Sequence, residues 1–448
     1  MKLSHTFVAG IPLAVVVLAL PGCHGTPIGV IPAQSPVTPA RAGQAPKTPL
    51  QHVIIVIQEN RSFDNLFAGY PGADTTMVGK THDGKSVRLK PITFSKVPLN
   101  HFYADGRTDD DHGRMDGFDE VPPNPPFNRY APYAYVERSL IKPYWDLAQQ
   151  YVLADHMFPT EMGPSFTAHL NLIAGTTTVA QGESIVDMAM LDGKTENGNC
   201  NDPAGTVTNL ITSSGQYLKD AGPFPCLSFH TLADALDPSH VSWKYYNAYW
   251  PTGGSLWNSF DAIKAVRYGP DWSKVVKVPK QILKDAADGH LAAVSWVIPT
   301  MPDSDHPGAG SRLGPSWVAS VVNAVGTGPD WKSSAIVVVW DDWGGWYDNA
   351  PPPQLDYRGL GLRVPCLIIS PYAKKGYVEH TQYEFGSILK TIELIFGLPT
   401  IGNTDRRAKG MFDAFDFTQA PRAFQTIPAT YSRDYFLHEP PSNLDLDD

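Results

Sequence analysis

Gln51-His-Val-Ile-Ile-Val-Ile-Gln-Glu-Asn-Arg-Ser-Phe-Asp64 is the stretch that decides the fold. Its unbroken apolar run at 53–57 is typical of a strand covered on both faces, as in the parallel sheets of α/β proteins. The run stops abruptly, and five polar side chains follow it: Glu59, Asn60, Arg61, Ser62 and Asp64. Ligands bind at the carboxyl ends of strands in such sheets. The sequence therefore predicts an α/β fold with a polar site at this edge.

The polar cluster suits a divalent cation and a phosphate. Carboxylate and amide oxygens are the ligands that such cations prefer, and Arg61 is a candidate substrate-binding residue, because a phosphate is bound well by a cation and a guanidinium together. Another interpretation stays open at this point. Asn60, Ser62 and Asp64 are also residue types that cap a following helix.

Three further apolar runs predict buried strands, at residues 292–298, 335–340 and 364–370. Asp341 and Asp342 directly follow the second run. Two adjacent carboxylates at a strand end are costly to place together without a cation. We therefore expect this pair to share a metal site with the cluster after residue 57.

Imidazoles follow the other two runs. His306 lies in Ser304-Asp-His-Pro307, just after the first run, and His380 comes soon after the third. We expect all four strand ends to carry polar clusters, and both histidines are candidates for proton transfer because imidazole titrates near neutral pH.

Ser165 lies at the expected start of a helix. Gly163-Pro164 makes a turn and Gly175 is a helix stop, which predicts a helix of roughly ten residues. A serine hydroxyl becomes a nucleophile when a base or a metal activates it, and a helix N-terminus offers free N–H groups to a phosphoryl oxygen. Ser165 is therefore a candidate nucleophile, although taken alone an ordinary helix cap is the simpler interpretation.

Residues 1–23 have the features of an export signal, since Lys2 and His5 precede an apolar run too short to span a bilayer stably. The run ends in Leu20-Pro-Gly-Cys23, which resembles a bacterial lipobox and predicts lipidation of Cys23; simple secretion is the alternative. Residues 24–48 are rich in proline and small residues and are expected to form a linker. We expect residues 49–448 to form one domain of an exported periplasmic, surface-anchored or secreted protein.

The net charge bears on the kind of partner, and the cysteines bear on disulfide formation. The net charge of -10 argues against a nucleic-acid partner, which normally requires a basic face. Cys200 and Cys226 lie in a stretch rich in Gly, Pro and Asn, and in an exported protein they are expected to form a disulfide. Cys366 is expected to be a buried apolar residue.

Residues 70–135 are polar and show no core pattern. Such long irregular segments are usually functional or disordered. Because this one contains His101 and His112 among many acids, we expect it to form the rim of an active site, with His112 as a candidate substrate-binding residue. A solvated acidic loop is the alternative for any single residue here.

These motifs together resemble a bacterial phosphoesterase family that includes phosphatidylcholine-hydrolysing phospholipases C and a burst-inhibiting acid phosphatase, a branch of the alkaline phosphatase superfamily. The motifs that carry the resemblance are Glu59-Asn-Arg-Ser-Phe-Asp64, Met115-Asp-Gly-Phe118, Gly163-Pro-Ser165, Ser304-Asp-His-Pro307, Trp340-Asp-Asp-Trp-Gly-Gly345 and Ser370-Pro-Tyr-Ala-Lys374. The resemblance implies an alkaline phosphatase-like, mostly parallel sheet sandwiched by helices, and makes residues 49–448 a catalytic domain.

The resemblance also implies roles for individual residues. One divalent metal would be held by Glu59, Asn60, Ser165, Asp341 and Asp342. Ser165 would also be the nucleophile, and His101, His306 and, with a weaker match, His380 would surround the phosphate. This chain departs from the family after the nucleophile, where Phe166-Thr-Ala-His169 replaces the usual Pro-Asn-Arg or Pro-Asn-His. His169 is a candidate substrate-binding residue, but the family's way of holding substrate near the serine does not carry over.

The expected activity is metal-dependent hydrolysis of a phosphate ester or phospholipid through a phosphoserine intermediate, with His306 protonating the leaving oxygen. Calcium, magnesium, manganese and zinc all stay open as the metal. A calcium-dependent surface binding protein and a phosphodiesterase are the alternatives. A sulfatase is disfavoured, because the segment that begins at Ser165 lacks the Cys/Ser-x-Pro-x-Arg motif.

Overall fold

The structure is a computed structural model that describes residues 47–440 and 442, apart from 95–96, 98, 122, 124, 192–193, 196–197 and 249–255. The expected export signal at 1–23, the lipidation site Cys23 and most of the linker at 24–48 lie outside the described residues. Ala45–Asp448 form one unit. No helix among the described residues is long and apolar enough to cross a membrane.

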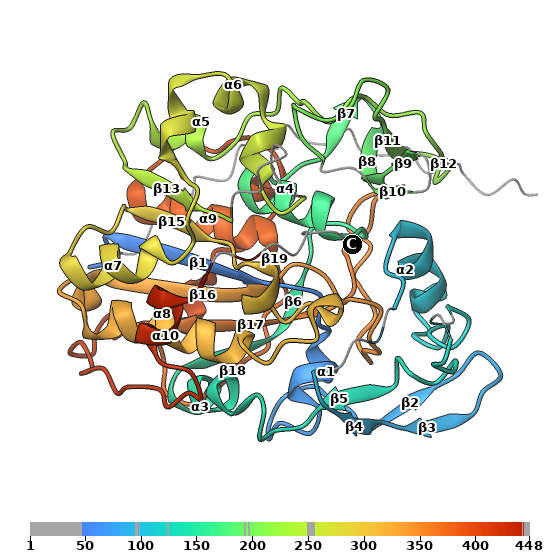
Figure 1. The fold of residues 1–448 in the computed structure, drawn as a ribbon, viewed down its shortest axis with the longest axis horizontal. Coiled ribbons are helices and arrows are strands. Elements are labelled where there is room, and N and C mark those ends of the chain that lie inside the picture. The colour runs from blue at the N-terminus through green and yellow to red at the C-terminus, as the bar shows by residue number, and fades with distance from the viewer. Residues whose placement is uncertain are drawn as a thin grey trace, which may run out of the picture. The chain divides into compact units, whose positions relative to one another are not determined.

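A nine-stranded sheet forms the centre of this unit, in the order β14-β13-β15-β1-β16-β17-β6-β18, with β19 also paired to β6 (Figure 1). Its strands are β1 (His52–Gln58), β6 (Val152–Phe158), β13 (Trp243–Tyr246), β14 (Val275–Val276), β15 (Val294–Val297), β16 (Ser334–Trp340), β17 (Val364–Ile369), β18 (Tyr377–Glu379) and β19 (Tyr383–Glu384). Among the described strands of this sheet, β17 alone is antiparallel to its neighbours, β16 and β6; the other pairs are parallel. The predicted mostly parallel α/β sheet is confirmed.

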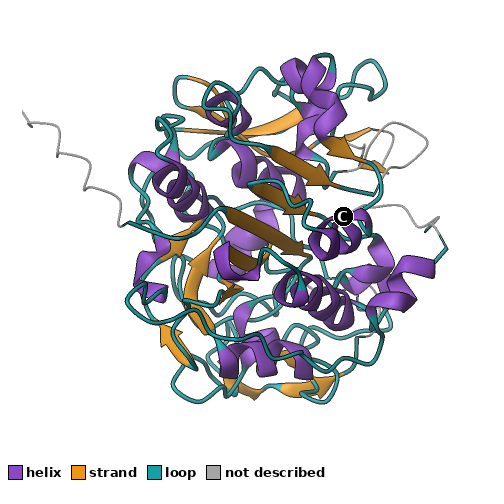
Figure 2. Cartoon of the chain, turned by 90° about the vertical axis from the view of Figure 1, so that its left-hand side faces the viewer, coloured by secondary structure: helices purple, strands orange, loops and turns teal. Residues whose placement is uncertain are grey.

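Helices surround the sheet, and the longer ones pack in two groups (Figure 2). Helices α3, α7 and α10 all contact α8, whereas α9 packs on α4. The helices are α1 (Phe63–Phe67), α2 (Tyr103–Asp110), α3 (Lys142–Gln150), α4 (Ser165–Ala174), α5 (Ala233–Leu236), α6 (Lys264–Arg267), α7 (Gln281–Asp288), α8 (Gly314–Thr327), α9 (Phe385–Phe396) and α10 (Arg433–His438). Short 3-10 turns are η1 (Ser259–Ala262), η2 (Pro270–Lys274), η3 (Met301–Asp303), η4 (Pro307–Ala309), η5 (Trp331–Ser333), η6 (Thr404–Arg406) and η7 (Met411–Ala414).

The two groups cover opposite faces of the sheet. Trp340 in β16 packs edge-on against Tyr144 of α3, with ring centroids 4.9 Å apart. Trp296 in β15 donates its indole N–H to the Leu172 carbonyl of α4 at 3.1 Å. The β1 residues that pair with these two tryptophans are three positions apart, so they point to opposite faces. Because both faces are covered, all of β16 and nearly all of β1 are buried, which explains their continuous apolar runs.

The direction of β17 corrects one expectation. Its register with β16 is antiparallel, and the Ser370 hydroxyl donates to the carbonyl of Ser334 at the first residue of β16. The end of the run at 364–370 therefore lies at the opposite edge of the sheet from Asp341. A buried apolar run specifies a strand but not its direction, so the prediction that this strand end joins the site was wrong.

Smaller sheets and the disulfide lie outside the central sheet. Cys200 and Cys226 form a disulfide and Cys366 is buried, as predicted. The segment 70–135 contains α2 and short strands that lie beyond one side of the sheet in Figure 1. The smaller strands are β2 (Val78–Lys80), β3 (Ser86–Arg88), β4 (Lys90–Ile92), β5 (Ala134–Val136), β7 (Thr178–Ala180), β8 (Glu183–Met188), β9 (Met190–Leu191), β10 (Lys194–Thr195), β11 (Thr208–Thr212) and β12 (Tyr217–Leu218).

Candidate active site

The parallel register of β1 and β16 brings the two acidic clusters together. Gln58 pairs with Trp340 at the last residue of each strand, and the Asp341 N–H donates to the Gln58 carbonyl at 3.0 Å. Glu59 and Asp341 therefore leave the sheet side by side. This convergence of strand ends, predicted from the sequence, is confirmed for β1 and β16.

Ser165 is the first residue of α4, directly after the N-cap Pro164, and its side chain is buried. Its hydroxyl lies 3.3 Å from Asp342 Oδ2 and 3.4 Å from the Asn60 side-chain nitrogen. The helix expected from Gly163-Pro164 to Gly175 is confirmed, and Gly175 ends it with φ +61°. Because Pro164 occupies the cap position, the hydroxyl of Ser165 faces the acidic cluster instead of capping the helix.

Asn60 connects the parts of the site. Its backbone N–H donates to Asp341 Oδ1 at 2.9 Å, and its side-chain nitrogen lies 3.2 Å from both Asp342 oxygens and 2.9 Å from His101 Nε2. The residue has φ +57°, in the left-handed region that few side chains adopt. Such strain is retained where the surrounding contacts fix the conformation, which is common in active sites.

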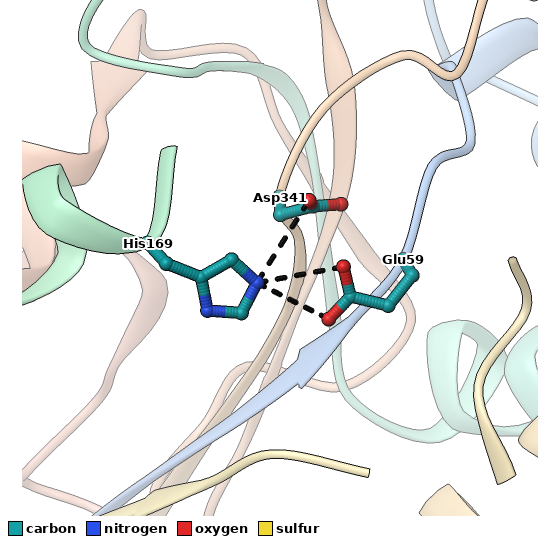
Figure 3. A group of neighbouring side chains, drawn as sticks. All are labelled: Glu59, His169 and Asp341. Carbon is teal, nitrogen blue, oxygen red and sulfur yellow. Dashed lines mark hydrogen bonds and ion pairs between the residues drawn. The ribbon is translucent and has the colours of Figure 1, made fainter. Parts of the chain in front are cut away.

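Glu59, His169 and Asp341 form a candidate metal centre (Figure 3). His169 Nε2 lies 3.2 and 3.4 Å from the two Glu59 oxygens and 3.8 Å from Asp341 Oδ2. All three side chains are buried, and one ligand atom from each lies within 4.8 Å of the others.

These residues fit a cation. Asp341 Oδ2 and Asn60 Oδ1 are buried and accept no hydrogen bond from the described residues. Glu59, Asp341 and Asp342 are all buried, and buried carboxylates are normally paired with a positive charge or a metal. The donor set therefore suits a divalent metal ion.

Two further histidines, His101 and His306, lie close to each other in this region, and His101 contacts Asn60. The rings of His101 and His306 have centroids 6.3 Å apart. His101 Nδ1 lies 3.0 Å from the Leu99 carbonyl and donates to it, so Nε2 carries the lone pair. The Gly308 N–H donates to His306 Nδ1 at 3.0 Å, so the neutral His306 ring carries its proton on Nε2.

Arg61 was expected to bind substrate, but the structure uses it to hold the site together. Its guanidinium is buried, donates to the Asp305 carbonyl at 2.8 Å and to Asn65 Oδ1 at 3.1 Å, and packs over Trp346 and Phe94. Burial lowers its pKa to about 10. Arg61 thereby fixes the residue next to His306 and does not act as an exposed phosphate ligand.

The side chain of Asp305 holds the segment that bears His306 in place. Its Oδ2 accepts hydrogen bonds from the Tyr144 hydroxyl at 2.8 Å and the Trp340 indole at 3.0 Å. Burial raises its pKa to about 6, against the opposing effect of Arg61. The position of His306 is thus set by contacts from α3 and β16.

His380 and His112 are not brought together with the serine. His380 Nδ1 lies 2.9–3.0 Å from both oxygens of Asp155 in the middle of β6, and its side chain is 61% exposed. His112 is exposed and has φ +58° just after α2. His380 follows β18, which pairs with the first half of β6 and so ends short of the site. Which part of β6 pairs with β18 is set by the sheet, so the spacing of residues along the chain could not reveal that His380 lies away from the site.

The sequence reasoning missed Trp257, which lies close to two of the site's histidines. The indole of Trp257 stacks on His169, with ring centroids 6.4 Å apart, and its centroid lies 6.0 Å from that of His306. Trp257 lies neither at a strand end nor in a recognisable motif, so no sequence signal pointed to it. Glu161, four residues before Ser165, supports α4 from a distance, since it accepts hydrogen bonds from Asn171 at 3.0 Å and from Thr177 at 2.7 Å.

The comparisons with known proteins agree with this geometry. The sequence profile of the family described as "Phosphoesterase family" matches residues 50–399. The chain is 25% identical over 432 residues to phospholipase C A of Mycobacterium tuberculosis, covering 84% of this chain and 79% of that protein. It is 23% identical over 417 residues to the hemolytic phospholipase C of Pseudomonas aeruginosa, covering 78% of this chain and 53% of that protein.

Among solved structures, a protein in the alkaline phosphatase superfamily from Vibrio parahaemolyticus aligns over 82% of this chain and 72% of that one, at 10% identity and a TM-score of 0.39. That likeness is too distant to add to the fold described above. The family profile, in contrast, spans most of the chain and includes every strand end that supplies the site. The chain therefore belongs to the phosphoesterase family and is an enzyme that hydrolyses phosphoric esters.

Proposed function

We propose that this enzyme is an exported, metal-dependent phosphoesterase that forms a phosphoserine on Ser165. The observation that carries the proposal is the position of the Ser165 hydroxyl, at the N-terminus of α4 and within 3.4 Å of Asp342 and Asn60. A nucleophile, an acidic cation site and a helix N-terminus are thereby combined in one buried place. These are the parts that phosphoryl transfer to a serine requires.

Glu59, Asn60, Ser165, Asp341 and Asp342 would hold the metal. The carboxylates of Glu59, Asp341 and Asp342 gather at the ends of β1 and β16, the Ser165 hydroxyl lies 3.3 Å from Asp342 Oδ2, and His169 lies against the same cluster. The Asn60 side-chain nitrogen lies 3.2 Å from Asp342, and the Asn60 Oδ1 atom, which is buried and accepts no hydrogen bond from the described residues, would be its ligand atom. When bound, a divalent ion lowers the pKa of a serine hydroxyl and offsets negative charge on a phosphoryl group.

The protein residues supply the remaining steps. Ser165 attacks phosphorus in line with the leaving oxygen, and N–H groups in the first turn of α4 bind phosphoryl oxygens. His306 carries its proton on Nε2 and offers this N–H to the leaving oxygen as a hydrogen-bond donor, which stabilises the charge that forms there. The leaving oxygen takes up the proton that the Ser165 hydroxyl loses on attack, and in the second step the water that hydrolyses the phosphoserine returns a proton to Ser165 Oγ. His101 accepts from the Asn60 amide at 2.9 Å and holds it against Asp342.

The substrate is a phosphate monoester or the phosphodiester of a phospholipid. The phospholipase C names of the relatives favour the phospholipid. The aromatic side chains of Trp243, Tyr245 and Tyr246 in β13 are buried in the core, so they do not form an exposed binding surface for a head group. A calcium-dependent binding protein without catalysis, the alternative expected from the sequence, disagrees with the family's hydrolase activity. It differs in needing no reactive serine.

Export is supported by the disulfide between Cys200 and Cys226, because disulfides persist in oxidising compartments. Residues 1–23 would direct export, and lipidation of Cys23 would anchor the enzyme to a membrane surface through the linker at 24–48. The net charge of -10 supports a substrate other than nucleic acid.

Ser165→Ala tests the proposal. We expect the variant to keep its fold and lose roughly 1,000-fold or more in turnover, because the covalent step is removed. Ser320→Ala is the matched control, since Ser320 is a buried serine in α8 on the opposite face of the sheet. After brief incubation of wild type with substrate and an acid quench, mass spectrometry should place a phosphoryl group on the peptide that contains Ser165. Near-normal turnover of Ser165→Ala, or a phosphoryl group on another residue, would refute the phosphoserine mechanism.

A substrate panel identifies the ester. Nitrophenyl phosphate, its diester and nitrophenyl phosphocholine should be assayed with and without a chelator. Chelation should abolish every activity and re-addition of metal should restore it. Preference for the monoester indicates a phosphatase, and preference for the phosphocholine ester indicates a phospholipase C. Binding of these esters without turnover would support the competing binding protein.

A further inference from the structure

His169 is the last residue of the segment in which this chain departs from the family's nucleophile motif. It lies four positions after Ser165 in α4, so both side chains project from the same face of the helix, one turn apart. Its buried Nε2 lies 3.2 Å from Glu59 Oε1 and 3.8 Å from Asp341 Oδ2 (Figure 3). The imidazole therefore points between two of the carboxylates assigned to the metal, and not toward solvent.

We propose that His169 is a nitrogen ligand of the metal site, so that the site selects zinc or iron(II) over calcium and magnesium. This inference rests on the proposed function, because it names the class of metal at the same site. Imidazole is a common ligand of zinc and iron, whereas calcium and magnesium are bound almost entirely by oxygen. A set of oxygen ligands alone would leave the choice of metal open. One imidazole ligand favours zinc or iron(II).

The distances agree with shared coordination. Ligand atoms bound at about 2.0–2.2 Å to one zinc ion lie roughly 3–4 Å from one another. The distances from His169 Nε2 to Glu59 and Asp341 fall within this range. Asp341 Oδ2, the atom nearest His169 on that side, accepts no hydrogen bond from the described residues.

Two neighbours fix the orientation of the imidazole. The Trp257 indole lies parallel to the ring, with an angle of 4° between the planes and 6.4 Å between centroids. The backbone of His169 is held in place as well, because it belongs to α4, which is buried along its whole length. Fixed orientation of a ligating imidazole raises metal affinity, because less side-chain freedom is lost on binding.

The competing interpretation is that His169 only donates a hydrogen bond to Glu59. One imidazolium would then face two buried carboxylates, with a third from Asp342 close by through Asn60. A single positive charge would leave most of that buried negative charge uncompensated, which is costly. A divalent ion with a neutral imidazole as ligand compensates it better, which favours coordination.

The test compares wild type, His169→Gln and, as a matched control, His306→Gln, which removes another imidazole of the same site. Each full-length exported protein is stripped with a chelator and titrated with zinc and, separately, with calcium. The affinity for zinc should exceed that for calcium by roughly 1,000-fold in wild type. His169→Gln should lower zinc affinity roughly 100-fold and change calcium affinity little. His306→Gln should keep the preference for zinc.

X-ray absorption at the zinc edge provides a second measurement that needs no activity. Zinc-loaded wild type and His306→Gln should show the outer-shell scattering of one imidazole, and His169→Gln should lack it. An oxygen-only shell in wild type, or calcium bound as tightly as zinc, would overturn the inference even if His169→Gln does not fold. Such a result would leave the phosphoserine mechanism standing, whereas failure to trap phosphoserine would leave the metal measurements unaffected.

Discussion

Single residues set the geometry of this site, and Gly344 is the clearest case. It follows Asp341 and Asp342 with φ +60°, and a Cβ there would lie 2.2 Å from the Asn60 carbonyl oxygen. The backbone of the β16 loop thus touches the backbone that bears Asn60. The Gly344 N–H also donates to Asp342 Oδ1 at 2.7 Å, so the carboxylate that faces Ser165 is positioned by this turn.

Gly344→Ala should therefore harm both stability and activity. We expect the free energy of unfolding to fall by about 3 kcal/mol or more, because strain at positive φ adds to the backbone clash. Gly84→Ala is the matched control: Gly84 has φ +76° but nothing within 4 Å of an added Cβ. That variant should lose only about 1–2 kcal/mol. Urea unfolding measures the free energy of unfolding of both variants. Equal decreases in the two variants would show that the backbone moves to relieve the contact with Asn60.

At the scale of elements, strand direction decides which polar clusters meet. The runs at 335–340 and 364–370 look alike in sequence, yet β16 is parallel to β1 and β17 is not. Direction follows from what connects the strands and from their neighbours in the sheet, and both are long-range properties. Asp341 consequently joins Glu59, whereas Ser370 lies at the other edge of the sheet.

The disulfide between Cys200 and Cys226 links two segments that lie outside the central sheet. Cys200 and Cys226 enclose a loop with a sequence separation of 26 residues. The Cys200 N–H donates to the Asp261 carbonyl of η1 at 3.2 Å, and the N–H of Leu227, the residue after Cys226, donates to the Ala262 carbonyl of η1 at 2.7 Å. Closing a loop of this length is worth about 3 kcal/mol in unfolded-chain entropy, so reduction should lower stability by about that amount. Guanidinium unfolding with and without reductant measures the change.

Thiol labelling provides the control for this prediction. When residues 49–448 are denatured without reduction, only Cys366 of this domain should react, because Cys200 and Cys226 stay bonded to each other. Labelled peptides that contain Cys200 or Cys226 under these conditions would disprove the bond.

At the scale of the whole molecule, buried acids are expected to control the pH dependence of stability. Burial is the largest cause of a raised pKa in each of the following groups, which reach about 6 to about 8: Asp64, Glu161, Asp187, Asp261, Asp303, Asp305 and Glu393. Between the unfolded and folded pKa values, the folded protein binds more protons than the unfolded chain. Stability should therefore fall as pH rises from about 4.5 to about 8, so the enzyme should be most stable in mild acid.

Glu161→Gln isolates one of these groups. Burial raises the pKa of Glu161 to about 7, with Arg358, Thr177 and Asn171 opposing the shift. The variant should flatten the decline in unfolding free energy between pH 4.5 and 7 by at most about 3 kcal/mol. Glu137→Gln, at an exposed glutamate, should leave the slope unchanged. A wild-type stability that rises across this range would contradict the prediction.

The sequence by itself determined four strands of the central sheet, β1, β15, β16 and β17, together with the helix that begins at Ser165, the disulfide, and the acids that directly follow β1 and β16. Continuous apolar runs require burial on both faces, and turn residues such as Gly163-Pro164 and Gly175 act locally, so these features can be read from neighbours in the chain. Only the tertiary structure decided that Arg61 is buried against Asp305, that His169 faces Glu59 and Asp341, and that His380 pairs with Asp155. Those outcomes depend on strand order, direction and register, which are set by packing between residues hundreds of positions apart.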